Sequence, residues 1–129
     1  MKYEFRSGII NIVCNLITEK NTFDGFGEYN SGSKSISVNI YQILEWGKGE
    51  FAKDDEIFAE IEETTLHELT HFFDYNFFKS WQYKEKDTAE HLAGFVESFH
   101  GLIQDIKEQI MAVVREEGLI YDESVQKSK

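Results

Sequence analysis

The chain has 129 residues, of which 41% are hydrophobic and 15% aromatic, and it contains no proline. This length suits one hydrophobic core, so we expect residues 1–129 to form a single domain. There are 13 basic and 24 acidic residues, which gives a net charge of −11. Such a charge argues against binding to the phosphates of nucleic acid and against binding to an anionic membrane surface.

Cys14 is the only cysteine, which excludes an intramolecular disulfide and a zinc cage built from cysteines. Its apolar neighbours predict a small buried residue and not a reactive thiol. The apolar stretch at residues 9–17 is too short to span a bilayer, and it lacks the small-residue cleavage site of a signal peptide. We therefore expect a cytoplasmic protein.

The first half of the chain predicts a helix followed by a β-hairpin. In residues 6–20 the apolar side chains recur in pairs every three to four residues, which is typical of an amphipathic helix with Ser7 as its cap. Residues 35–40 alternate strictly between polar and apolar, which predicts a half-buried strand. Residues 23–29 would pair with this strand through a turn at residues 30–33.

The second half predicts three helices. The first is short, covers residues 41–46 and stops at the glycines of residues 47–49. The second begins at residue 54 or 55 and runs through Phe72, with acidic side chains at its start, where the helix dipole favours them. After a polar turn, a last helix begins at residues 87–90 and ends at Gly118. The chain should therefore have an α+β fold.

Two of the four histidines lie in the sequence His67-Glu68-Leu69-Thr70-His71, an HExxH motif. Residues four apart share one face of a helix, so both imidazoles can reach one metal ion. The glutamate lies one step around the helix, where it can act as a base without binding the metal. A shuffled chain of this composition would contain the motif roughly 0.02 times. Uncharged residues also flank it, which favours a zinc site over two structural histidines.

A catalytic zinc site needs a third protein ligand and an open position for water. The metzincin continuation would place Gly at position 74 and His or Asp at position 77; Asp74 and Phe77 exclude that class. The last helix offers Glu90 and Glu97, which are seven residues apart and share a face. Glu90 also has the spacing of a capping box, and Glu97 could be a solvated surface residue. Spacing alone leaves both open.

A resemblance to known families separates the two glutamates. The HExxH motif followed after 18 residues by Glu90 is similar to the thermolysin-like gluzincins, whose third ligand is such a glutamate. The segment Glu90-His91-Leu92-Ala93 more closely resembles the Glu-x-x-Ala/Val segment of the ImmA/IrrE-like and phage-encoded small metallopeptidases. The resemblance spans residues 33–103. Gly94 and the lack of proline depart from that family, so its repressor-cleaving role is not carried over.

The resemblance implies a minimal zincin-like fold with an N-terminal helix, a small sheet or hairpin, an active-site helix and a ligand helix. It implies one Zn²⁺ held by His67, His71 and Glu90, with Glu68 as general base and a peptide or protein as substrate. Two other functions stay open, a non-proteolytic zinc module of mobile-element origin and a zinc amidase. Glu68 argues against the first, because a structural zinc needs no unliganded carboxylate.

Other polar side chains are weaker candidates. An oxyanion needs a hydrogen-bond donor, and His91, His100, Tyr75 and Tyr83 are chemically able to supply one, but the spacing selects none. Asp74 shares a helix face with the motif and could orient an imidazole. The aromatic cluster predicts core packing and consists of Phe72, Phe73, Phe77, Phe78 and Trp81. The strand at residues 35–40 would pair with an extended substrate if it lay at the sheet edge.

Overall fold

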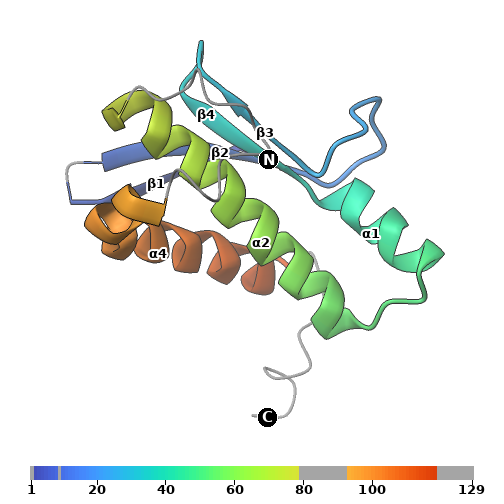
Figure 1. Cartoon of the computed structure of the whole chain (residues 1–129). Coiled ribbons are helices and arrows are strands. Elements are labelled where there is room, and N and C mark those ends of the chain that lie inside the picture. Colours follow the sequence, from blue (N-terminus) through green and yellow to red (C-terminus); the bar gives the residue numbers. More distant parts are fainter. Residues whose placement is uncertain (1, 9, 79–92, 119–129) are drawn as a thin grey trace.

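The computed structural model describes residues 2–8, 10–78 and 93–118. Within these ranges the chain is α+β, with a four-stranded mixed sheet on one side and the long helices on the other (Figure 1). The elements are β1 (Lys2–Ser7), β2 (Ile10–Ile17), β3 (Gly27–Asn30), β4 (Ser35–Asn39), α1 (Ile40–Gly49), α2 (Asp54–Phe73), the π-helix η1 (Asp74–Phe78) and α4 (Ala93–Glu116).

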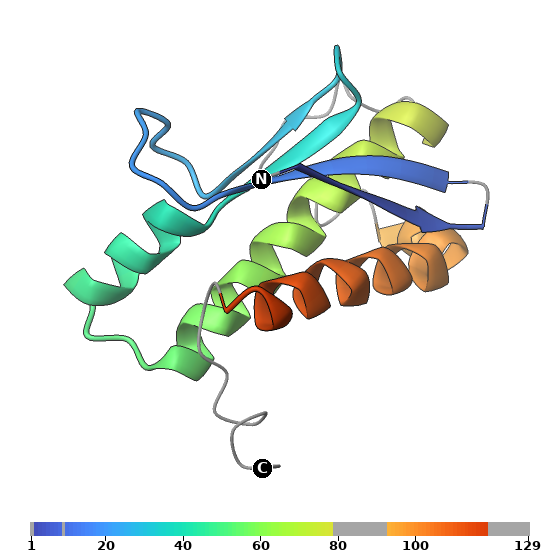
Figure 2. The ribbon, with the colours of Figure 1, turned by 180° about the vertical axis from the view of Figure 1, so that it is seen from behind.

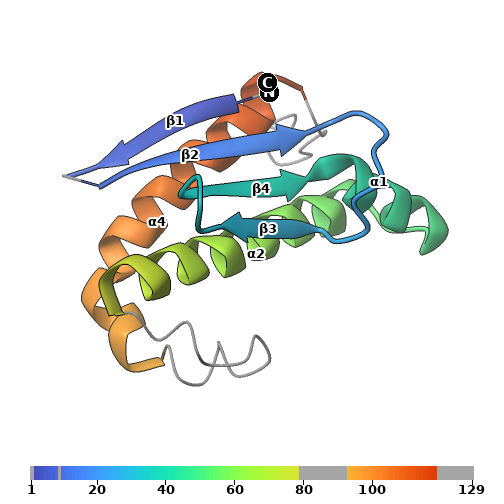
Figure 3. The same cartoon turned by 90° about the horizontal axis from the view of Figure 1, so that it is seen from above.

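The strands lie in the order β1-β2-β4-β3. β2 and β4 are parallel, and the two outer pairs are antiparallel. Seen from above, α2 runs beneath β3 and β4 and α4 runs beneath β1 (Figure 3). The view from behind shows both helices on the same face of the sheet (Figure 2). One core therefore lies between the sheet and this pair of helices.

The predicted N-terminal helix is wrong, because residues 6–20 instead contain the end of β1, a turn and β2. The buried residues of β2 alternate, as a strand requires: Ile10, Ile12, Cys14 and Leu16. The half-buried Val13 and Ile17 stand beside them in the sequence, and these extra apolar residues produced the misleading helical spacing. Branched Ile and Val also favour a strand.

Ser7 closes the β1–β2 hairpin and does not cap a helix. It pairs with Ile10 across the turn. Gly8 follows with a φ of +60°, a conformation that glycine adopts without the cost that other residues incur.

The other predicted elements are found where the structure describes the chain, whereas the predicted start of the last helix at residues 87–90 and the turn before it lie outside the described residues. The strand at residues 35–40 is confirmed as β4, and its predicted hairpin partner is confirmed as β3. However, β4 is an inner strand, so it is not at the edge; β3 is the edge strand on that side. The long helix begins at Asp54 as predicted. Gly118 follows α4 with a φ of +64°, which confirms the predicted end.

The glycines of residues 47–49 do not interrupt α1, which is longer than predicted. Gly47 is buried where α1 meets α2: a Cβ at this position would lie 2.6 Å from Cδ1 of Ile57. The lack of a side chain therefore lets the two helices approach. None of the helices in the described ranges combines the length and apolar character needed to cross a membrane.

Candidate metal centre

The HExxH motif lies in the last two turns of α2. One side of this part of the helix packs into the core. Leu69 and Phe73 are fully buried in the core. The hydroxyl groups of Thr65 and Thr70 donate to backbone carbonyls four residues earlier, at 2.8 and 2.7 Å, so they are satisfied within the helix. The histidines occupy a half-buried face beside these core residues.

The two imidazoles of the motif converge. The Nε2 atoms of His67 and His71 are 3.1 Å apart, and the rings are nearly perpendicular, with an interplanar angle of 83°. Two nitrogens bound tetrahedrally to one Zn²⁺ at their usual bond length would be about 3.3 Å apart. The separation in this structure is close to that value, so the donor type and the spacing of this pair both fit zinc.

Glu68 is 4% exposed and faces the edge strand β3. The contact is close. A Cβ placed on Gly27 would lie 2.8 Å from Cγ of Glu68 and 3.0 Å from its Oε2 atom. The carboxylate of the motif is therefore sheltered by the backbone of β3.

A cavity of about 330 Å³ opens beside this carboxylate. One wall comes from the start of β3 and the loop before it, and the other from α2. The lining residues are Gly25, Phe26, Gly27, Glu60, Glu63, Thr64, His67 and Glu68. The cavity thus includes one histidine and the glutamate of the motif.

Asn39 holds the loop wall of this cavity in place. Its side chain is fully buried, and Nδ2 donates to the carbonyls of Phe23 and Gly25 at 2.9 and 3.0 Å. Its backbone N–H donates to the carbonyl of Phe26 at 2.7 Å. The ring of Phe26 in turn packs edge-on against Trp46, with centroids 6.0 Å apart. The wall is therefore built by buried contacts before any ligand enters.

The third predicted ligand cannot be placed. Glu90 lies outside the described residues. Glu97 belongs to α4, but its side chain also lies outside the described part. Among the described residues there is no group of three or more His, Cys, Asp or Glu able to hold a metal. The described part of the site therefore brings together two of the three predicted ligands, His67 and His71.

Three of the remaining predicted residues, Asp74, Tyr75 and His100, lie just after α2 or on α4. Asp74 is 4% exposed and starts η1. Tyr75 is 36% exposed, with its ring 5.8 Å from that of Tyr29. His100 is exposed on α4. His91 and Tyr83 lie outside the described residues.

Part of the predicted aromatic core can be checked. Phe72 and Phe73 are buried and confirm the prediction for these two positions. The side chains of Phe77 and Phe78, and all of Trp81, lie outside the described part.

The cavity was not predicted from the sequence. Glu60, Glu63 and Thr64 precede His67 by seven, four and three residues, a spacing that places them on its face of the helix. That signal was available. The opposite wall of the cavity carried no such signal, because the glycines before β3 suggested only turns.

Comparison of the chain with family models, with curated proteins and with solved structures finds no match.

Proposed function

We propose that the protein is a zinc-dependent metallopeptidase in which His67 and His71 hold one Zn²⁺ and Glu68 is the general base. The main support is the convergence of the two Nε2 atoms, 3.1 Å apart, beside a buried carboxylate. The bound zinc would polarise the substrate carbonyl and acidify the attacking water. The resemblance adds Glu90 as third ligand and a zincin-like fold.

In this proposal Glu68 moves the proton. It accepts a proton from the water that attacks the peptide carbonyl, and it then delivers that proton to the leaving amine. Its position under β3 shields it from bulk water. The outer edge of β3 would pair with an extended substrate, because β4, the strand considered for this role from the sequence, is enclosed between two neighbours.

Metal analysis and a peptide-hydrolysis assay on four proteins test this function. The wild-type protein should carry about one zinc per chain and hydrolyse peptides. His67→Ala and His71→Ala should lose the zinc. Glu68→Gln should keep it and lose at least ~100-fold in hydrolysis, because an amide cannot accept the proton. Full zinc content in both histidine variants would contradict the site. Zinc lost from Glu68→Gln would make Glu68 a ligand.

The same measurement distinguishes Glu90 from Glu97. Glu90→Ala should weaken zinc binding by at least the ~10–100-fold seen on perturbing outer-shell partners of a metal, whereas Glu97→Ala should leave it nearly unchanged. Because Glu90 could also cap its helix, thermal melts with and without zinc are needed. A lost cap lowers both melting temperatures, and a lost ligand removes the zinc-dependent increment. The reverse pattern would make Glu97 the ligand.

A further inference from the structure

We propose that the cavity beside His67 is a specificity pocket for a cationic side chain, arginine or lysine, of the peptide substrate. This inference rests on the proposed peptidase function, because it assigns a substrate class to the same site. Its basis is the combination of a preformed cavity, two carboxylates on its α2 wall in addition to that of Glu68, and direct continuity with the HExxH residues.

The two carboxylates are Glu60 and Glu63. No Lys or Arg lines the described cavity, and no described basic residue forms an ion pair with either glutamate. The helix dipole does not explain them, because it favours acidic residues in the first turn, which here ends at Glu56. Glu62 makes a useful contrast, since it lies between them in sequence and is paired with Lys107 of α4 at 3.0 Å.

The two carboxylates repel each other on the same wall, where Glu60 is half-buried and Glu63 is exposed. Residues three apart on a helix are neighbours, and like charges at this spacing repel. Burial raises the pKa of Glu60, and the charge of Glu63 raises it further. A guanidinium or ammonium group in the cavity would offset both the desolvation and the repulsion.

The dimensions also suit a long cationic side chain. At a rise of 1.5 Å per residue, Glu63 lies about 6 Å and Glu60 about 10 Å from His67 along the helix axis. A substrate residue next to the scissile bond would extend its aliphatic stem along Phe26. Gly25 and Gly27 add no side chain to that wall. The charged end would then reach Glu63 first and Glu60 beyond it.

A titration with side-chain mimics tests the pocket without any hydrolysis. Amide ¹⁵N spectra of the wild-type chain are recorded with n-butylguanidinium and with its neutral isostere n-butylurea. The cation should shift the resonances of Gly25, Gly27 and Thr64 and bind at least about ten-fold more tightly than the urea. Equal binding of the two probes would overturn the inference, and this comparison needs no variant.

A pair of matched double variants locates the effect. Glu60→Gln with Glu63→Gln should reduce the affinity for butylguanidinium to that for butylurea. Glu45→Gln with Glu116→Gln removes the same charge from exposed positions on α1 and α4 and should leave the affinity unchanged. Equal losses in both double variants would assign the binding to net charge alone and would also overturn the pocket.

Hydrolysis of peptide pairs that differ only by arginine or citrulline separates this inference from the proposed function. The wild-type protein should prefer arginine next to the scissile bond by at least ten-fold in kcat/KM, and the pocket double variant should lose that preference. Cleavage without preference would overturn the pocket and keep the peptidase. Guanidinium binding without any cleavage would keep the cation site and overturn the peptidase.

Discussion

Gly27 is the residue at which the fold and the candidate site meet. It begins the edge strand β3 and lies over the helix of the HExxH motif. A Cβ at this position would come within 2.7 Å of Cγ2 of Thr64, in addition to its short approach to Glu68. The sequence alone predicts that His67 and His71 share one face of a helix, because helical periodicity is local. It does not predict the contact of Gly27 with Glu68, because only the packing of strand on helix brings these two residues together.

Gly27→Ala should therefore disturb both stability and hydrolysis. Thr64 and Glu68 must shift to admit the methyl group, and overpacking of this kind costs about 1–3 kcal/mol in the free energy of unfolding. Denaturant unfolding measures the loss of stability. The rate of hydrolysis should fall by more than the decrease in the folded fraction explains. Gly49→Ala is the matched control, because a Cβ there meets nothing within 4 Å. Its stability should stay within about 0.5 kcal/mol of wild type.

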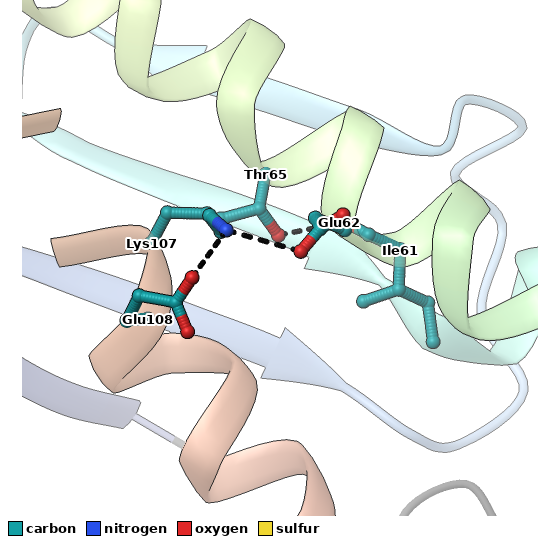
Figure 4. A network of polar contacts seen from close by, with 5 residues as sticks. All are labelled: Ile61, Glu62, Thr65, Lys107 and Glu108. Carbon is teal, nitrogen blue, oxygen red and sulfur yellow. Dashed lines mark hydrogen bonds and ion pairs between the residues drawn. The ribbon is translucent and has the colours of Figure 1, made fainter. Parts of the chain in front are cut away.

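At the scale of elements, α4 is joined to α2 by a buried ammonium group (Figure 4). Nζ of Lys107 donates to Glu62 of α2 at 3.0 Å and to Glu108 of α4 at 2.6 Å, while the lysine side chain is only 8% exposed. Burial opposes the charge, but the hydrogen bonds to Glu108 and Glu62 outweigh it and raise the pKa of Lys107. The same contact lowers the pKa of Glu108.

Lys107→Met should lower the free energy of unfolding by about 1 kcal/mol near neutral pH, because it leaves two carboxylates facing each other. Because the pKa of Lys107 is raised in the folded state, its contribution to the free energy of unfolding is complete below pH 10.5, the ordinary pKa of lysine. This contribution is lost as the pH rises through the folded pKa. Because the pKa of Glu108 is lowered in the folded state, its contribution to the free energy of unfolding is complete above pH 4.5, the ordinary pKa of glutamate. This contribution is lost as the pH falls through the folded pKa. The difference between the two proteins should thus be largest between these limits.

Urea unfolding from pH 3 to pH 8 measures this difference. Lys48→Met is the control, because Lys48 pairs with Glu45 at 3.3 Å but is 76% exposed. An exposed pair should contribute at most a few tenths of a kcal/mol. A Lys107→Met effect that stayed constant down to pH 3 would indicate lost packing of the lysine stem in place of a lost ion pair.

The elements differ in how far the sequence alone could predict them. α2 has a long periodic pattern with acidic residues at its start, and β4 alternates strictly, so both were recognised. β2 was not, because its apolar pairs satisfy the helical and the strand period together. What decides between them is pairing with β1 and β4, which is a non-local interaction. The wall of the cavity was missed for the same reason.

At the scale of the whole molecule, the site and the sheet share one core. Cys14 in β2 and Leu69 and Phe73 in α2 belong to the same buried cluster. β2 is hydrogen-bonded on both sides, to β1 and to β4. Because α2 supplies both the motif and a large part of this cluster, we expect the candidate metal centre and the sheet to unfold together.

Cys14 reports on this cooperativity. It is fully buried, as the sequence predicted, and burial raises the pKa of its thiol to about 12. Alkylation by iodoacetamide at pH 8 should therefore be slow in the native protein and should proceed through global unfolding. Its rate should rise with urea along the same slope as unfolding followed by circular dichroism. Rapid alkylation with little dependence on urea would show that the β1–β2 hairpin opens separately.

Zinc extends the same measurement to the candidate site. If the metal binds only the folded chain at His67 and His71, a hundred-fold excess over its dissociation constant adds about 2.7 kcal/mol to the free energy of unfolding. Alkylation of Cys14 should then slow by about 100-fold, although the thiol lies in the sheet and not at the site. In the His67→Ala variant zinc should no longer slow the alkylation of Cys14. Without zinc, the alkylation rate of this variant should match the free energy of unfolding measured for the variant itself. A zinc effect on circular dichroism melts without an effect on Cys14 would show that the two parts unfold independently.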